Sequence, residues 1–195
     1  LASVEDDALV LTGRCLPYGK GITYWPLRDL VRRAAGEVTL EGIEKLLGGE
    51  PESAKVAARV AGAIGIAGST SAPEETMWAA RRFLEHLARE RPVVIAFDDL
   101  QWAEQTFLDL IEYLLGWIRD APILIVCMAR PDLLEQHPGW LGAAPSASSI
   151  VLDPLSEPEA QALLGLLSGE TQLAPDLYAQ ITEAAEGNPL YVEQM

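Results

Sequence analysis

Apolar and polar positions follow two different patterns along the chain. Up to about residue 153, short runs of consecutive apolar residues alternate with longer segments in which apolar residues recur every three or four positions. The short runs have the length of buried strands, and the longer segments have the period of amphipathic helices. Beyond residue 154, only the helical period remains. The pattern therefore predicts an α/β domain over residues 1–153, followed by a small helical domain over residues 154–195.

Three apolar runs are predicted to form the core strands, at residues 10–13, 93–97 and 123–129. The last two are apolar throughout, which is typical of strands that are covered on both faces, as in a parallel sheet. The segment between them places its apolar side chains on one helical face, so the three together predict a right-handed βαβ unit. A further short strand is expected at residues 149–152, and a loop at residues 132–147.

Serine, proline and glycine residues mark where helices are expected to begin and end. Residues 71–74 and 156–159 have the Ser-x-x-Glu pattern of a capping box, so we expect a helix to start at each. Gly187 is expected to end one helix, Asn188 to cap the next, and Pro189 to occupy its first position. The other expected helices start at Pro26 or span about 40–48, 52–64 and 175–186.

The chain is strongly acidic, with 14 Lys and Arg against 29 Asp and Glu and a formal charge of −15. All 14 basic residues lie within residues 1–130, whereas residues 131–195 hold ten acidic residues and no Lys or Arg. Such a surface repels phosphate-rich partners, so we expect no direct contact with DNA or RNA.

Membrane insertion and secretion are not expected either. No apolar run approaches the roughly 18 residues that a membrane-spanning helix needs, and the first residues lack the pattern of a secretory signal. Cys15 and Cys127 both lie in apolar, strand-like segments without further metal-ligating residues nearby. We therefore expect two buried, reduced thiols in a cytoplasmic protein.

The most distinctive polar residues are Asp98 and Asp99, which directly follow the apolar run 93–97. Ligands of parallel sheets bind at the carboxyl ends of the strands, where one carboxylate can hold a cation and another can face a water molecule. The alternative is that one of the two caps the following helix, which is expected to start near Trp102. Arg130 follows the neighbouring strand, so its guanidinium is expected at the same rim, either binding an anionic group or pairing with one aspartate.

Residues 13–21 imitate a phosphate-binding loop but do not match its spacing. That motif has four residues between its glycines, followed by Lys and a Ser or Thr that binds magnesium. Here five residues separate Gly13 from Gly19, Gly21 follows Lys20, and no helix is predicted to start there. We therefore do not assign phosphate binding to this segment.

Residues 93–104, VVIAFDDLQWAE, resemble the Walker B segment of the STAND class of AAA+-related ATPases. Within this class, the chain is most similar to modules of large LuxR-type transcriptional regulators and multidomain adenylate cyclase-like proteins. Residues 11–27 are similar to the second strand and following loop of the class, residues 123–131 to its sensor-1 strand with a terminal Arg, and residues 187–190 to the GxP-type motif of its helical lid. The resemblance implies a P-loop NTPase-like α/β core with a helical lid subdomain.

The resemblance also implies roles for individual residues. Asp98 would hold Mg²⁺ through water, and Asp99 would polarise the water that attacks the terminal phosphate of ATP. Arg130 would sense that phosphate, while Asn188 and Pro189 would belong to the nucleotide-binding part of the lid, with Pro189 near the base. By analogy, the ATP-bound form would self-associate and signal, and the ADP-bound form would rest.

One part of the family pattern is not found in the 195 residues. The phosphate-binding loop of the class, with its Lys and Ser or Thr, would lie before Leu1, and residues 1–5 resemble the end of the helix that follows it. We therefore expect a core without its first strand and phosphate loop, which binds ATP weakly and hydrolyses none measurably. Without that strand, residues 123–129 would form an open edge, where residues 149–152 or a second chain could pair.

Two other classes of protein share features of this sequence. A non-catalytic interaction module on the same fold, binding a protein through its acidic helical part, stays open as the alternative. A phospho-acceptor receiver domain also has an acidic pair at a strand end, but it needs a Lys at a later strand end, and the chain has no Lys after Lys55. The receiver class is therefore excluded.

Overall fold

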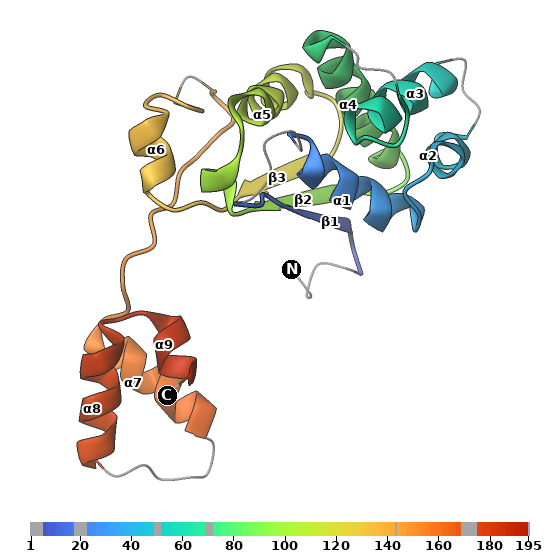
Figure 1. Ribbon diagram of the computed structural model, residues 1–195. Helices are drawn as coiled ribbons and strands as arrows, with labels where there is room; N and C mark the ends of the chain where they lie inside the picture. Colours follow the sequence, from blue (N-terminus) through green and yellow to red (C-terminus); the bar gives the residue numbers. More distant parts are fainter. Residues whose placement is uncertain are drawn as a thin grey trace. The chain divides into compact units, whose positions relative to one another are not determined.

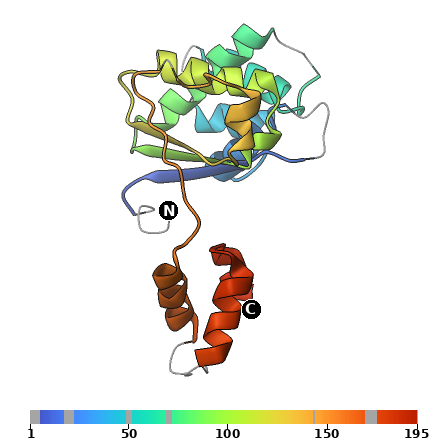
Figure 2. The ribbon, with the colours of Figure 1, turned by 90° about the vertical axis from the view of Figure 1, so that its left-hand side faces the viewer.

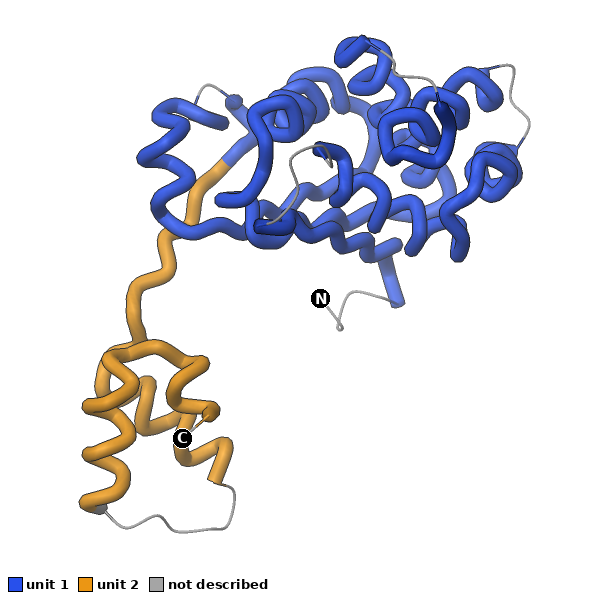
Figure 3. Tube along the Cα trace, in the orientation of Figure 1, with its two compact units in different colours: residues 1–147 blue, residues 148–195 orange. Residues whose placement is uncertain are grey.

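The computed structural model of the chain describes residues 6–17, 23–48, 52–68, 72–142, 144–168 and 175–194. It divides into two compact units, unit 1 with residues 1–147 and unit 2 with residues 148–195 (Figure 3). The division lies a few residues before the boundary at residue 153 that the apolar pattern suggested. The expected helix end at residues 1–5, together with Lys20 and Ser71, lies outside the described residues.

Unit 1 is built on a parallel sheet in which the strands lie in the order β1-β2-β3 (Figure 1). The strands are β1 (Leu9–Arg14), β2 (Val93–Asp98) and β3 (Ile123–Cys127). Gly13 of β1 lies opposite Phe97 of β2, which lies opposite Cys127 of β3. The predicted core strands are therefore present, and the α/β class with a parallel sheet and a helical C-terminal part is confirmed.

Helices α1 to α5 lie on one side of this sheet, as two perpendicular views show (Figure 1, Figure 2). Both connections between neighbouring parallel strands run in the same direction across the sheet, so right-handed crossovers place their helices on the same face. None of the helices that the structure describes is long and apolar enough to cross a membrane. The elements of these connections are α1 (Trp25–Ala35), α2 (Leu40–Leu46), α3 (Ser53–Ala63), α4 (Pro73–Leu87), the short 3-10 helix η2 (Leu100–Trp102) and α5 (Gln105–Trp117).

The apolar core of unit 1 lies between these helices and the sheet. Phe83 of α4 and Phe107 of α5 are completely buried, and Phe107 packs edge-on against Phe97 of β2 with ring centroids 5.2 Å apart. The apolar residues of β2 are at most 8% exposed, as its unbroken apolar run predicted. β2 is therefore held firmly in the core and carries Asp98 at its end on a rigid support.

β3 is less buried than β2, although its sequence is equally apolar. The side chain of Leu124 is 57% exposed, and the strand ends at Cys127 rather than at residue 129. Ile123 and Ile125 pack against the core under the helices, whereas Leu124 lies on the other face of the sheet, and β3 is an outer strand with a described neighbouring strand on one side only. The prediction that both strands are covered on both faces is therefore wrong for β3.

Residues 149–152 form no strand, contrary to the prediction. Ile150, Val151 and Leu152 are 75 to 89% exposed, and among the described residues the sheet consists of β1, β2 and β3. A single extended segment has no backbone hydrogen-bond partner, and β propensity alone does not make a strand. The hypothesis that residues 149–152 pair beside β3 is therefore wrong.

Two local predictions in unit 1 concern the start of α4 and residues 132–147. The N-cap of α4 is Ala72, which makes no side-chain cap bond, while Ser71 of the predicted capping box lies outside the described residues. Pro73 nevertheless begins the helix, because its fixed φ suits the first helical position. Residues 132–147 are not entirely loop, because they include the short helix α6 (Asp132–Gln136), whose early acidic residues suit the positive end of the helix dipole.

Unit 2 contains the helices α7 (Glu157–Ser168), α8 (Pro175–Ala185) and α9 (Pro189–Gln194). At the start of α7, the Ser156 N–H and hydroxyl both donate to the Glu159 carboxylate, at 2.8 and 2.6 Å. The helix start predicted from the Ser-x-x-Glu pattern is therefore confirmed. The small apolar core of the unit consists of Ala160, Leu164, Ile181, Ala185 and Val192.

The predicted Gly-Asn-Pro turn is confirmed as the junction between α8 and α9. Gly187 has a φ of 76°, and a Cβ at this position would lie 2.6 Å from the carbonyl oxygen of Leu155, so glycine is required. Asn188 caps α9, because its side-chain oxygen accepts a hydrogen bond from the N–H of Leu190 at 3.0 Å. Pro189 is the first residue of α9.

Candidate functional site

The ends of β2 and β3 lie side by side and bring the predicted site residues of unit 1 together. Asp98 is the last residue of β2, and Arg130 follows the end of β3. The N–H of Met128 donates to the carbonyl oxygen of Phe97 at 2.8 Å, and the N–H of Leu100 donates to that of Met128 at 3.1 Å. These two bonds tie the Asp98–Asp99 turn to the segment that carries Arg130, as the sequence predicted.

The turn after β2 has an unusual backbone at Asp99. Its φ of 56° and ψ of 38° place it in the left-handed region, which residues other than glycine rarely adopt. The N–H of Asp99 donates to Oδ1 of Asp98 at 2.9 Å. Asp99 precedes η2 without a side-chain cap bond, and Glu104 is the residue before α5. The alternative that one of the two aspartates caps the next helix is therefore not supported.

Arg14 is a residue of this site that sequence reasoning missed. It ends β1 opposite Asp98, and its Nε donates to Oδ2 of Asp99 at 2.6 Å while Nη2 lies 2.5 Å from the same oxygen. Its distance to Oδ2 of Asp98 is longer, at 4.0 Å. The sequence did contain a signal for Arg14. Like Arg130, it directly follows an apolar run that is predicted to form a strand, so it could have been placed at the same end of the sheet.

Gln101 is a second residue that sequence reasoning missed. Its side-chain N–H donates to Oδ1 of Asp99 at 2.9 Å, and its side-chain oxygen accepts a hydrogen bond from the backbone N–H of Arg130 at 3.2 Å. Within the described residues, the Arg130 side chain forms no ion pair with Asp98 or Asp99, and Arg14 takes that position instead. The alternative that Arg130 pairs with an aspartate is therefore wrong.

The surroundings of Asp99 favour its charged form. Partial burial by itself raises the pKa of this carboxyl, but hydrogen bonds from Arg14 and Gln101 and the positive charges of Arg14 and Arg130 lower it more. The resulting pKa lies below the usual range, so Asp99 is a carboxylate at neutral pH. Conversely, its hydrogen bond and charge raise the pKa of Arg14.

The carboxylate of Asp98 fits a role in holding Mg²⁺. Its side chain is half exposed, and its Oδ1 accepts one backbone hydrogen bond, while Oδ2 has the distant contact with Arg14. Among the described residues, no cluster of three or more His, Cys, Asp or Glu could hold a metal. Mg²⁺ is usually bound by one or two carboxylates together with waters and substrate phosphates, and Asp98 provides a ligand of that kind.

The predicted lid residues Asn188 and Pro189 belong to unit 2. Both have a complete structural role there as the cap and first residue of α9. Their contact with a nucleotide stays a prediction.

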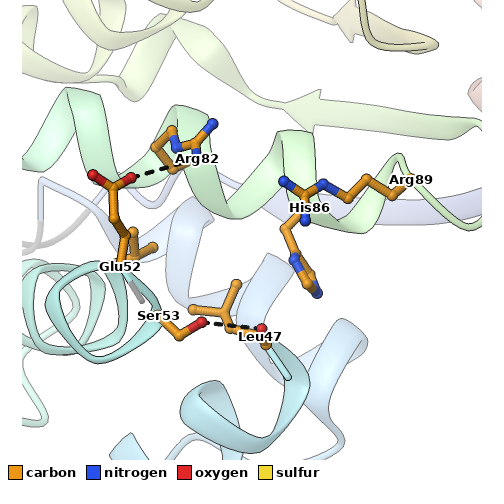
Figure 4. Close-up of a pocket in the computed structure, with 7 residues that line it drawn as sticks. Leu47, Glu52, Ser53, Arg82, His86 and Arg89 are labelled. Carbon is orange, nitrogen blue, oxygen red and sulfur yellow. Dashed lines mark hydrogen bonds and ion pairs between the residues drawn. The ribbon is translucent and has the colours of Figure 1, made fainter. Parts of the chain in front are cut away.

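Two hollows of unit 1 lie away from the strand ends. The hollow between α3 and α4 has a volume of about 20 Å³, which is room for roughly one water molecule. Of the polar groups that line it, Arg82 pairs with Glu52 at 3.4 Å and Ser53 donates to the carbonyl oxygen of Leu47 at 3.1 Å (Figure 4). A larger groove of about 610 Å³ lies between α5 and residues 139–146. Asp98, Asp99 and Arg130 line neither hollow.

Comparison with known proteins assigns the family. A family model described as an AAA ATPase domain matches residues 1–126, a range that includes Arg14, Asp98 and Asp99 and ends within β3. The chain belongs to the AAA ATPase domain family. Membership implies nucleotide binding and hydrolysis in general, with ATP and Mg²⁺. The carboxylate pair at the end of β2 thus lies in the part of this AAA ATPase domain that the family model covers.

Relatives add little on the function of this AAA ATPase domain. An uncharacterized protein of Rhizobium meliloti (strain 1021) is 31% identical over 116 residues, which cover 58% of the chain and 11% of that protein. The chain thus spans about a tenth of the length of this curated relative. No solved structure matches the chain.

Proposed function

We propose that this AAA ATPase domain is the nucleotide-binding and hydrolysing switch core of a STAND-class signal-transduction regulator, either of transcription or of cyclic-nucleotide synthesis. The observation that carries the proposal is the Asp98–Asp99 pair at the end of the buried strand β2, beside the segment of Arg130. The family supports the ATPase part, and the resemblance of residues 93–104 supports the narrower class. In this proposal, hydrolysis acts as a timer that returns a self-associating, ATP-bound form to rest.

In this proposal, each residue at the ends of β2 and β3 has a separate role in phosphoryl transfer. Asp98 would hold Mg²⁺, which when bound offsets the negative charge of the phosphates. Asp99 is charged at neutral pH and can orient and polarise a water molecule. Arg130 carries a guanidinium that the aspartates leave unpaired, so it can contact the terminal phosphate. Asn188 and Pro189 of unit 2 would approach the base.

These residues do not include a phosphate-binding loop. No Gly-x4-Gly-Lys-Ser/Thr segment occurs in the 195 residues, and backbone amides of such a loop normally supply much of the phosphate affinity. We propose that residues outside these 195 supply it. The 195-residue chain by itself should then bind Mg·ATP only weakly, and isothermal titration that gives a micromolar dissociation constant would contradict this.

The proposed role of Asp99 is tested by Asp99→Asn in the full-length protein. Because the amide cannot act as a base, we expect steady-state ATP hydrolysis to fall by about 10²-fold or more, with Mg·ATP affinity changed only a few-fold. The matched control is Asp120→Asn, the same chemical change at an exposed residue between α5 and β3. Unchanged hydrolysis in Asp99→Asn would refute the role, and equal losses in both variants would point to a general effect of charge.

A non-catalytic interaction module is the second candidate, and the surface of unit 2 favours it. Its charged residues are all acidic, and Leu166 and Leu190 are 81% and 57% exposed. Such a surface suits a basic, amphipathic protein partner. Full-length protein that shows no ATP hydrolysis, whatever residue stands at position 99, would favour this candidate over the ATPase.

A further inference from the structure

We propose that Gln101 is a positioning residue that couples the Arg130 segment to the carboxylate of Asp99. This inference rests on the proposed function, because it concerns how the reactive carboxylate is held. It goes beyond that function by assigning to η2 a link between the two groups that would act on the terminal phosphate and its attacking water.

The geometry of the Gln101 amide carries the inference. One end of the amide donates to Oδ1 of Asp99 at 2.9 Å, and the other end accepts from the backbone N–H of Arg130 at 3.2 Å. A carboxylate can only accept and a backbone N–H can only donate, so this amide orientation is the one that satisfies both partners. A side chain with one donor and one acceptor at this distance is needed to bridge them.

The remaining contacts of Asp99 leave its orientation with little freedom. Arg14 donates to the other carboxylate oxygen, Oδ2, at 2.6 Å from the end of β1. Each oxygen of Asp99 is therefore held by a side chain from a different element, and the left-handed backbone at Asp99 further restricts where the carboxylate can point. Of these two partners, Gln101 is the one that also contacts the segment after β3.

The bridge has a mechanical consequence at the rim of the sheet. Gln101 binds the backbone N–H of Arg130 rather than its guanidinium. A shift of that backbone when Arg130 contacts an anion would therefore change the hydrogen bond from Gln101 to Oδ1 of Asp99 and with it the orientation of the carboxylate. A residue that only stabilised the turn would not transmit this shift.

The first test measures the bridge itself, without activity, by hydrogen exchange of the 195-residue chain followed by NMR. Gln101→Leu removes both bonds with little change in side-chain size. We expect the Arg130 amide to exchange about tenfold faster in Gln101→Leu than in the wild type. Equal exchange in the wild type and Gln101→Leu would overturn the inference.

The control for this test is Gln105→Leu. Gln105 also donates to a carboxylate, Oδ1 of Asp109, at 2.7 Å, but on the exposed surface of α5. Its loss should leave the exchange of the Arg130 amide unchanged. Faster exchange in Gln105→Leu as well would show a general loosening rather than a specific bridge, and would count against the proposal.

The second test separates positioning from binding in the full-length protein. Gln101→Leu should lower kcat for ATP hydrolysis by about tenfold or more and leave KM for Mg·ATP within about threefold, because it removes no phosphate contact and adds no charge. Gln105→Leu should retain the wild-type kcat. An active wild type with unchanged kcat in Gln101→Leu would overturn this inference alone, whereas an inactive wild type would overturn the proposed function and the positioning role together.

Discussion

Single residues at the strand ends acquire their chemistry from burial. Cys15 lies just beyond β1, Cys127 ends β3, and both belong to the face of the sheet that packs against the helices. Burial raises the pKa of each thiol to about 12, and the negative charge of Asp99 adds to the effect at Cys15. Both are therefore protonated and unreactive at neutral pH. Cys15 is buried, as expected, whereas Cys127 is only partly buried.

The thiols should resist alkylation while the chain is folded. At pH 8, a pKa of about 12 leaves on the order of a thousandfold less thiolate than an ordinary pKa of about 8.5. We expect iodoacetamide to modify Cys15 and Cys127 at least 100-fold more slowly in the folded chain than in urea, as measured by mass spectrometry. Equal rates in the two states would show that the thiols are exposed.

The same pKa shift predicts how stability depends on pH. Above about pH 8.5 the unfolded chain loses thiol protons that the folded chain keeps, so the unfolded state binds fewer protons and the free energy of unfolding falls as pH rises. For each thiol the decrease is at most about 1.4 kcal/mol per pH unit. Urea unfolding between pH 8 and 10 checks this, with a Cys15→Ala, Cys127→Ala chain as the control that should lack the effect.

At the scale of elements, close approach between β1 and α1 depends on one glycine. A Cβ at Gly13 would lie 2.6 Å from the carbonyl oxygen of Pro26 and 2.9 Å from its Cβ, so α1 could not stay where it packs. This contact places the start of α1 against the end of β1, next to Arg14. In contrast, a Cβ on Gly116 near the end of α5 would meet no atom within 4 Å.

Alanine substitutions at these two glycines should have opposite effects on stability. We expect Gly13→Ala to lower the free energy of unfolding by about 1–3 kcal/mol, because the backbone of α1 must shift to relieve the overlap. Gly116→Ala should raise it by about 0.5–1 kcal/mol, because alanine favours the helix and finds open space. Urea unfolding followed by circular dichroism measures both, and a stabilising Gly13→Ala would show that β1 and α1 are less closely packed.

For the molecule as a whole, the sheet has an outer strand with unused pairing capacity. β3 lies at the edge of the described strands, and its side chain Leu124 is 57% exposed. Unpaired edges of this kind invite pairing with a second chain. The formal charge of −15 opposes such contact between copies, since like charges repel until salt screens them.

We predict that the 195-residue chain self-associates through β3, and more strongly at high salt. Sedimentation velocity should show the dimer fraction rising between 0.05 and 0.5 M NaCl, taking the Debye length from about 14 Å to about 4 Å. Leu124→Lys, which places a charge on the edge strand, should abolish the dimer. A chain that stays monomeric at high salt would contradict the prediction.

Local patterns were sufficient for most elements of this fold. The unbroken apolar run of β2, the proline at the start of α4 and the Gly-Asn-Pro turn before α9 each act within a few residues, so sequence reasoning placed them correctly. Sequence reasoning failed where the structure of a segment depends on its neighbours in the sheet. Residues 149–152 have strand-forming side chains but no neighbouring strand, and β3 is as apolar as β2 but lies at an edge.

The amino-acid sequence by itself determined the order of the elements and the types of side chain at the strand ends, because both depend on short-range spacing. The tertiary structure decided which of those side chains meet. Arg14 and Asp99 are 85 positions apart, and their contact exists because β1 pairs with β2 in one register. The bridge from Gln101 to Arg130 likewise depends on β3 lying next to β2. Pairing between distant strands is a property of the folded sheet, so no pattern within one segment contains it.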